Sequence, residues 1–246
     1  MPDVYVVFEP EVLTQTFLVD KTAVVIDVLR ATSSMLTALA AGAARVVPVM
    51  EVEEARAAAS RLPAGAAILG GERGGLPIDG FDVGNTPQEY GPQVVGGKTV
   101  VMTTTNGTRA ILMALPAAEV LVAALVNVAA TARQLEAGDG RRDVVLVTSG
   151  TERRVSWEDV FCAGAIAERL AAAGDAGPWR LTDSALIAVE AGHAARGDVQ
   201  AALRRGRGGR NVERLGLGDA FAACGAVDSI RLAARVNKAP LEIVAV

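Results

Sequence analysis

The sequence predicts an α/β protein, in which a mostly parallel sheet lies between two helical layers in a three-layer α/β/α arrangement. Short aliphatic runs, such as residues 24–26 and 100–102, alternate with Ala- and Leu-rich helical patterns. Hydrophobic residues make up 51% of the 246-residue chain, whereas aromatic residues make up only 4%. Parallel strands buried on both faces read as continuous aliphatic runs, and strand–helix alternation indicates βαβ units. We therefore expect a single α/β domain over residues 1–246.

A repeat divides most of the chain. Residues 24–49 read VVIDVLRATSSMLTALAAGAARVVPV, and residues 100–125 read VVMTTTNGTRAILMALPAAEVLVAAL. Each segment gives a strand, a polar loop with Thr and Arg, a helix and a second strand. Each is followed by an Ala-rich helix and a third strand that ends in a Gly-Glu-Arg or Gly-Thr-Glu-Arg loop. We predict an internal duplication of a βαβαβ unit, with halves at about 22–97 and 98–181 and a C-terminal extension, 182–246, of helices and a terminal strand.

Composition excludes several classes of protein. No apolar run approaches the roughly 18 residues that span a bilayer, and the first residues lack a signal-peptide pattern, so we expect a cytoplasmic protein without a membrane partner. The formal net charge of -4 argues against nucleic-acid binding. We interpret the basic segment Arg204–Arg210 as a mobile surface loop. The two cysteines, Cys162 and Cys224, are expected to be buried. The large share of aliphatic residues in the chain favours a homodimer.

Four polar loops follow predicted strands and should meet at one edge of the sheet. They are residues 27–34, 70–75, 103–109 and 149–154. In an open parallel sheet, ligands bind beyond the carboxyl ends of the strands, where such loops and helix N-termini converge. We expect the four loops to surround one cleft.

The loop TTTNGT before the helix at 110–115 is a candidate anion cradle. Backbone N–H groups at a helix N-terminus attract anions, and Gly107 permits close approach. The sequence lacks the lysine of a P-loop and a GxGxxG fingerprint. The alternative is an ordinary capped helix start. The candidate cradle residues are Thr103, Thr104, Thr105, Asn106, Gly107 and Thr108.

Charged residues in the same loops point to an anionic ligand and a metal. A planar guanidinium suits bidentate contact with phosphate, carboxylate or sulfonate, so several arginines predict a small, multiply anionic substrate. Hard carboxylate oxygens suit Mg²⁺, although each acid alone is compatible with a surface ion pair. The only histidine, His193, is interpreted as a surface residue. The arginines are Arg30, Arg73, Arg109 and Arg153, and the acids are Asp27, Glu72, Asp82, Glu158 and Asp159.

Taken together, these segments resemble the 2-phosphosulfolactate phosphatase family. The resemblance covers most of residues 20–170 and is carried by VVIDVLRATSSMLTALAAGA, LGGERGGLPIDGFDVGNTPQEY, GKTVVMTTTNGTRAI and WEDVFCAGAIAERL. Members of this family are Mg²⁺-dependent phosphatases that release phosphate from 2-phospho-3-sulfolactate, a step towards coenzyme M in methanogens. The resemblance implies the same activity here, and this substrate carries a phosphate, a carboxylate and a sulfonate.

The resemblance and the residue pattern together give expected roles. Asp82, Glu158 and Asp159 are expected to bind Mg²⁺, since FD and ED fall at matching places in the two halves. Thr103–Thr108 would hold the phosphate, and the arginines would share the three anions. Asp27 either attacks phosphorus or orients a metal-bound water. The expected catalytic residues are Asp27, Arg30, Glu72 and Arg73, and the expected substrate-binding residues also include Arg109 and Arg153.

Two other functions are compatible with the same residues. One is a phosphatase for another phosphorylated hydroxy acid, because arginine binds sulfonate and carboxylate alike. The other is a non-catalytic protein that binds a phosphorylated acid. Several carboxylates in the cleft argue against the second alternative, since without a metal they would repel its ligand.

Overall fold

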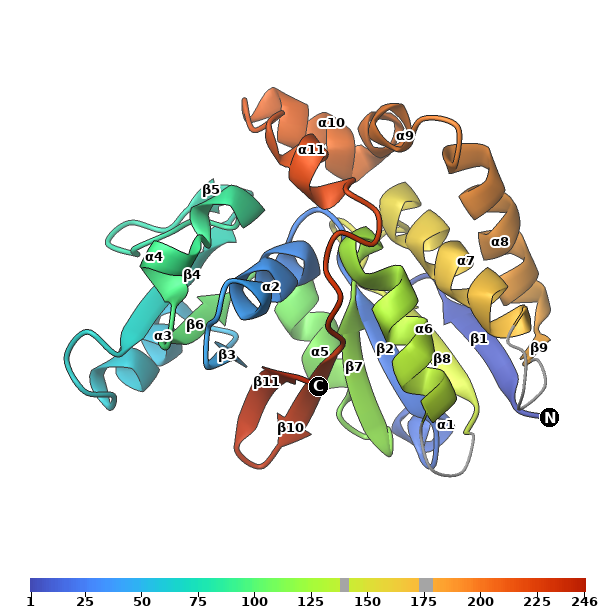
Figure 1. The fold of residues 1–246 in the computed structure, drawn as a ribbon, viewed down its shortest axis with the longest axis horizontal. Coiled ribbons are helices and arrows are strands. Elements are labelled where there is room, and N and C mark those ends of the chain that lie inside the picture. Colours follow the sequence, from blue (N-terminus) through green and yellow to red (C-terminus); the bar gives the residue numbers. More distant parts are fainter. Residues whose placement is uncertain (138–141, 173–178) are drawn as a thin grey trace.

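The strands of the protein form one sheet in a computed structural model that describes residues 1–137, 142–172 and 179–246. Eleven strands from these residues lie in the order β5-β4-β6-β3-β11-β10-β7-β2-β8-β1-β9 (Figure 1). Their bounds are β1 (Asp3–Val7), β2 (Thr22–Ile26), β3 (Arg45–Pro48), β4 (Ala67–Arg73), β5 (Leu76–Pro77), β6 (Thr99–Thr103), β7 (Glu119–Ala123), β8 (Val144–Thr148), β9 (Arg180–Leu181), β10 (Ala234–Lys238) and β11 (Leu241–Ala245).

Helices cover both faces of this sheet. The α-helices are α1 (Gln15–Leu18), α2 (Ala31–Ala40), α3 (Val52–Ser60), α4 (Pro92–Val95), α5 (Gly107–Ala114), α6 (Val128–Ala137), α7 (Trp157–Ala171), α8 (Asp183–Ala195), α9 (Val199–Arg205), α10 (Arg207–Arg214) and α11 (Ala220–Cys224). Three short 3₁₀ helices are η1 (Pro10–Val12), η2 (Pro87–Glu89) and η3 (Leu125–Asn127).

The sheet consists of two parallel groups of strands joined by an antiparallel hairpin. In one group β4, β6 and β3 are parallel, and in the other β7, β2, β8, β1 and β9 are parallel. The hairpin β10–β11 pairs with β7 on one side and with β3 on the other, antiparallel to both. The predicted α/β class with a mostly parallel sheet and helices on both faces is confirmed.

The strand order is symmetric with respect to the repeat in the sequence. In the repeat, β2 corresponds to β6, β3 to β7 and β4 to β8. When corresponding strands are exchanged, the order β4-β6-β3 becomes β8-β2-β7. These three strands of the other group are neighbours in that order when the sheet is read from its opposite side. The first strand of each predicted half therefore lies between the second and third strands of the other half. Residues 138–141 and 173–178, which fall in the second predicted half, lie outside the described residues.

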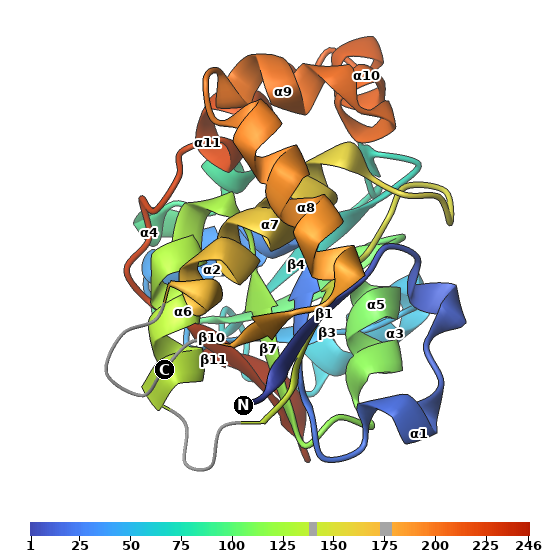
Figure 2. The ribbon, with the colours of Figure 1, turned by 90° about the vertical axis from the view of Figure 1, so that its right-hand side faces the viewer.

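Alternate side chains of the central strands enter two separate cores. Val24 and Ile26 of β2 pack in one core with residues of α6, α7 and α8. Ala23 and Val25 pack in the other core with residues of α1, α2 and α5. Figure 2 shows α5 and α6 on opposite sides of the strands. This period-two alternation explains why the strands read as unbroken aliphatic runs.

The C-terminal extension is richer in structure than expected. The predicted terminal strand is present, but it is the second strand of a hairpin. The interpretation of Arg204–Arg210 as a mobile loop is wrong, because these residues belong to α9 and α10. Their glycines allow close packing: a Cβ at Gly209 would lie 1.9 Å from the Leu203 carbonyl oxygen. Figure 1 shows α9, α10 and α11 grouped together beyond one edge of the sheet.

The described helices include none that is both long and apolar enough to cross a membrane. Cys162 and Cys224 are free and buried, as expected. His193 is an exposed residue of α8 whose Nε2 lies 3.0 Å from Glu168 Oε1.

Candidate active site

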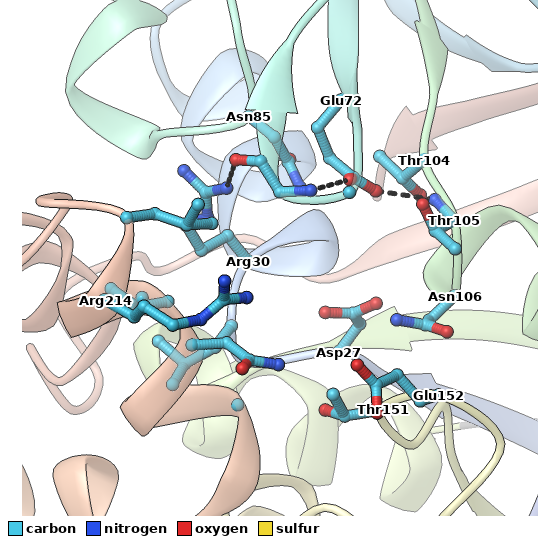
Figure 3. A pocket seen from close by; sticks show the side chains of 17 residues that line it. Asp27, Arg30, Glu72, Asn85, Thr104, Thr105, Asn106, Thr151, Glu152 and Arg214 are labelled. Atoms are coloured by element: carbon cyan, nitrogen blue, oxygen red, sulfur yellow. Dashed lines mark hydrogen bonds between the residues drawn. The ribbon is translucent and has the colours of Figure 1, made fainter.

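One cavity of about 260 Å³ collects residues from all four predicted loops (Figure 3). A fifth element, α10, closes one side of it. The lining residues are Asp27, Leu29, Arg30, Glu72, Gly74, Gly75, Asn85, Thr104, Thr105, Asn106, Thr151, Glu152, Gly208, Asn211, Val212, Arg214 and Leu215.

Asp27 lies just beyond the end of β2, in the turn that leads into α2. The backbone of this turn is fixed by Thr32, whose hydroxyl donates to the Asp27 carbonyl oxygen (2.8 Å) and accepts from the Asp27 N–H (2.9 Å). The Ala31 N–H donates to Asp27 Oδ1 (3.1 Å). Asp27 is only 6% exposed. Its carboxylate is therefore held in one orientation at the cavity wall.

Gly107, the first residue of α5, brings the N-terminus of that helix against Asp27. A Cβ at this position would lie 2.8 Å from Asp27 Oδ2 and 2.6 Å from the Ala31 Cβ. Both distances are shorter than van der Waals contact, so a side chain would force α5 away from Asp27. The sequence places glycine where the helix N-terminus must approach a carboxylate.

Burial raises the pKa of the acidic groups around this point. It raises the pKa of Asp27 to about 6, with a further increase from Glu72, while hydrogen bonds from Ala31 and Ser149 oppose the shift. Burial raises the pKa of Glu158 to about 7, with a further increase from the charge of Asp27. The pKa of Asp159 is also raised by burial and by both neighbouring carboxylates. The three carboxylates thus interact with one another in a buried region, where little water is available to solvate their charge.

Glu72 joins two of the loops. Its Oε1 accepts a hydrogen bond from the Thr105 N–H (2.6 Å), and its Oε2 accepts one from the Gly75 N–H (2.7 Å). Figure 3 shows this carboxylate between the two loops at the cavity wall. Both oxygens are engaged with backbone donors, so Glu72 positions the loops rather than reacting.

The TTTNGT loop lines the cavity in part. Thr104, Thr105 and Asn106 face it. Thr104 and Thr108 bond to each other, with each hydroxyl accepting from the other's backbone N–H (3.1 and 3.2 Å). Thr103 donates to the Met50 carbonyl oxygen (2.8 Å). Thr103 and Thr108 are fully buried and outside the cavity lining, so the substrate contacts expected of them stay predictions.

Only one of the four predicted arginines, Arg30, lines the cavity. It is 5% exposed and donates to Thr86 Oγ1 (2.8 Å) and to the Gly75 carbonyl oxygen (2.6 Å). Arg73 instead donates to Thr103 Oγ1 (2.8 Å) and to backbone carbonyls, and Arg109 pairs with Glu11 at 3.0 Å. Arg153 is exposed outside the cavity lining. These three arginines lie outside the cavity lining, and the substrate contacts expected of them stay predictions, because sequence position does not reveal which way a loop side chain points.

The predicted metal set does not assemble. Asp82 is exposed, and its Oδ2 accepts from the Leu69 N–H (2.8 Å) on β4. Asp159 accepts from the N–H groups of Val28 (2.8 Å) and Gly150 (3.2 Å) and from Ser149 Oγ (3.2 Å), so it joins the loops after β2 and β8. The described residues contain no group of three or more His, Cys, Asp or Glu side chains that could hold a metal ion. Metal binding by Asp82 and Asp159 therefore stays a prediction, which this geometry does not support.

Glu158 differs from these acids. It is 1% exposed, and its Oε2 has no hydrogen-bond partner in the described part of the chain. A Cβ at Gly208 would lie 1.9 Å from Glu158 Oε1, so the carboxylate packs directly against a residue of α10 that lines the cavity. A buried, unpartnered carboxylate oxygen is costly unless a ligand satisfies it.

Sequence reasoning missed the cavity residues of α10 and of the segment after β5. Asn211 and Arg214 project from α10, and Asn85 is a buried residue whose Oδ1 lacks a partner within the described residues. The GGR pattern of α10 looks like a flexible loop, because glycine normally disfavours a helix. The signal that was available is the amphipathic run Asn211–Leu215, which places polar and apolar residues at helical spacing.

Comparisons with known proteins agree with the geometry. The family model described as 2-phosphosulpholactate phosphatase matches residues 7–238. A protein of Caldanaerobacter subterraneus subsp. tengcongensis named probable 2-phosphosulfolactate phosphatase is 47% identical over 153 residues, which cover 62% of this chain and 63% of the relative. Proteins of the same name from Symbiobacterium thermophilum and Clostridium acetobutylicum are both 40% identical and cover 87% of this chain, and 91% and 88% of their own lengths. The chain therefore belongs to the 2-phosphosulfolactate phosphatase family.

Proposed function

We propose that this protein hydrolyses 2-phospho-3-sulfolactate to 3-sulfolactate and phosphate, with Mg²⁺ as cofactor. The observation that carries the proposal is the approach of the α5 N-terminus to the buried Asp27 within the cavity, in a chain of this family. A helix N-terminus attracts a phosphate, and a carboxylate beside it supplies a group that can act on the attacking water.

The phosphate would bind at the start of α5. Asn106 and Asp27 both line the cavity (Figure 3), and Gly107, the first residue of α5, lies against the Asp27 carboxylate. Arg30 adds a fixed positive charge, because Thr86 and Gly75 hold its guanidinium in place. Donors that are positioned before substrate arrives stabilise developing charge without reorganisation.

Asp27 would act as the general base. Its pKa of about 6 leaves it ionised at neutral pH but close enough to that pH to accept a proton efficiently. It takes a proton from the water that attacks phosphorus, the bond between phosphorus and the ester oxygen breaks, and the alkoxide of sulfolactate leaves. Direct attack on phosphorus by Asp27 is the alternative that the sequence leaves open. Cys162 is a poor candidate nucleophile, since it is buried and burial holds its pKa well above the usual range.

The residues present fit a magnesium ion. Mg²⁺ commonly uses one or two carboxylates and completes its shell with water and substrate oxygens. Glu158 would hold the ion, because it is buried with a raised pKa and its Oε2 has no hydrogen-bond partner among the described residues. When bound, Mg²⁺ supplies positive charge that offsets the substrate's negative charge and stabilises the transition state.

Cellular location and assembly are further parts of this proposal. We expect a cytoplasmic protein, and the two free, buried cysteines are compatible with a reducing compartment. The homodimer and the absence of a nucleic-acid partner remain predictions from composition.

A substrate panel tests the reaction. With Mg²⁺ present, we expect 2-phospho-3-sulfolactate to give the highest kcat/KM among phosphosulfolactate, phospholactate, phosphoglycolate and the phosphoglycerates, measured by phosphate release. A different best substrate would indicate a phosphatase for another hydroxy acid. Folded protein that turns over none of them would instead support a non-catalytic binding function.

The metal assignment is tested with a pair of acidic variants. We expect EDTA to abolish turnover and Mg²⁺ to restore it. Glu158→Gln should lower kcat by at least about a hundredfold, the scale of losing an electrostatic group at a reacting centre. The matched control, Asp82→Asn, should keep nearly full activity, because Asp82 lies outside the cavity. Equal activity of Glu158→Gln and wild type would exclude Glu158 as a ligand.

Replacement of Asp27 should separate activity from stability. The raised pKa means that the folded state binds this proton more tightly than the unfolded chain, so the free energy of unfolding falls as pH rises from about 4 to about 6. Asp27→Asn removes this cost and should raise the free energy of unfolding by about 1–3 kcal/mol at pH 7.5 in EDTA, with no gain below about pH 4. Turnover should be lost.

Urea unfolding at the two pH values, with wild type alongside, measures the effect. A variant that is less stable than wild type at pH 7.5 would contradict the assignment of Asp27 as a destabilised, functional carboxylate.

A further inference from the structure

Arg214 is an arginine that lines the cavity. It is the last residue of α10, and its side chain extends into the cavity towards Asp27 and Asn106 (Figure 3). It is exposed, and the described residues offer it no hydrogen bond or ion pair. Arg30 differs, because it is buried and already donates to Thr86 and Gly75.

The other arginines of α9 and α10 all have a structural contact. Arg204 pairs with Glu213 at 3.3 Å and stacks over Phe221, and Arg205 stacks over Trp157. Arg207 pairs with Glu152 at 2.8 Å, and Arg210 donates to the Arg205 carbonyl oxygen. Arg214 is thus the exception in a segment where guanidinium groups otherwise support the fold, and it is the one that faces the cavity.

The helix that carries Arg214 is fixed relative to the cavity. Glu158 packs against Gly206 and Gly208 so closely that a Cβ on either would lie within 2.5 Å of a carboxylate oxygen. The Arg207–Glu152 ion pair connects α10 to a loop that lines the cavity. The backbone that carries Arg214 is therefore in place before the ligand binds, and only the side chain itself has to be ordered on binding.

A substrate with several anionic groups needs more than one positively charged side chain in this cavity. Three carboxylates line it, namely Asp27, Glu72 and Glu152, whereas its only cationic lining residues are Arg30 and Arg214. A substrate with three anionic groups leaves at least one of them away from Arg30 and the α5 N-terminus. A planar guanidinium matches two oxygens of a sulfonate in a fork geometry.

We propose that Arg214 binds the sulfonate of the substrate and thereby sets the preference for a phosphorylated acid that carries this second strong anion. This inference rests on the proposed function. Arg214 acts in binding, on the side of the cavity opposite the α5 N-terminus, and the phosphate contacts do not depend on it.

The test compares Arg214→Gln with wild type on two substrates. For 2-phospho-3-sulfolactate we expect kcat/KM to fall at least about thirtyfold, mainly through a higher KM, as expected for loss of a charge-assisted bidentate contact. For phospholactate, which has a methyl group in place of the sulfonate arm, kcat/KM should change less than about threefold. Arg214→Lys keeps the charge without the fork and should be intermediate. Arg204→Gln, on the neighbouring helix but outside the cavity, is the control and should match wild type.

Calorimetry with the product provides a readout independent of turnover. Arg214→Gln should weaken 3-sulfolactate binding at least about tenfold and leave the Kd of inorganic phosphate unchanged, with circular dichroism confirming the fold. If wild type turns over phosphosulfolactate and Arg214→Gln keeps the same ratio of kcat/KM between the two substrates, the Arg214 proposal is overturned and the proposed function is not. Equal losses on both substrates would assign Arg214 to the carboxylate and also overturn it. If wild type shows no turnover, the proposed function is contradicted. In that case, unchanged 3-sulfolactate binding by Arg214→Gln would also reject the role of Arg214.

Discussion

The burial of Asp27 against the N-terminus of α5 is the constraint on which the site depends. Gly107 lets the helix start come close to the carboxylate, and Thr32 and Ala31 fix the turn that carries it. Burial disfavours the charged form, as the pKa of about 6 indicates. A protein retains such a destabilised charge where a ligand uses it. The folded state is therefore less stable at neutral pH than it would be with a neutral residue at this position.

The remaining carboxylates near the cavity have two different tasks, which burial alone does not distinguish. Glu72 and Asp159 use both of their oxygens to accept hydrogen bonds from neighbouring loops, and they hold those loops around the cavity. Glu158 leaves one oxygen without a partner in the described structure and presses against α10. The hydrogen-bond partners, rather than the residue types, separate the carboxylates that position loops from the one available to a ligand.

Much of the fold and part of the site could be predicted from the sequence. Aliphatic periodicity gave the mostly parallel sheet, and the repeat anticipated a strand order that is symmetric under exchange of the halves. Strand-end loops located Asp27, Arg30 and Thr104–Asn106 at one cavity, because local sequence determines where strands end. Side-chain direction depends on tertiary contacts, so local sequence does not reveal that Arg73, Arg109 and Asp82 lie outside the cavity lining. Arg214 was missed because the glycine-rich start of α10 resembles a loop, and the close packing of Gly208 on Glu158 that accommodates it there is a tertiary contact.

The central claim is that the phosphate binds where the α5 N-terminus meets Asp27, and a crystal structure with Mg²⁺ and orthovanadate tests it most directly. Vanadate resembles the phosphoryl group in transfer and binds where the protein stabilises that group. We expect a vanadate oxygen within hydrogen-bond distance of the Gly107 N–H, with the vanadium centre beside Asp27 and the ion on Glu158. Vanadate bound instead beside Arg73 or Arg109, with the α5 N-terminus free of ligand, would contradict the claim.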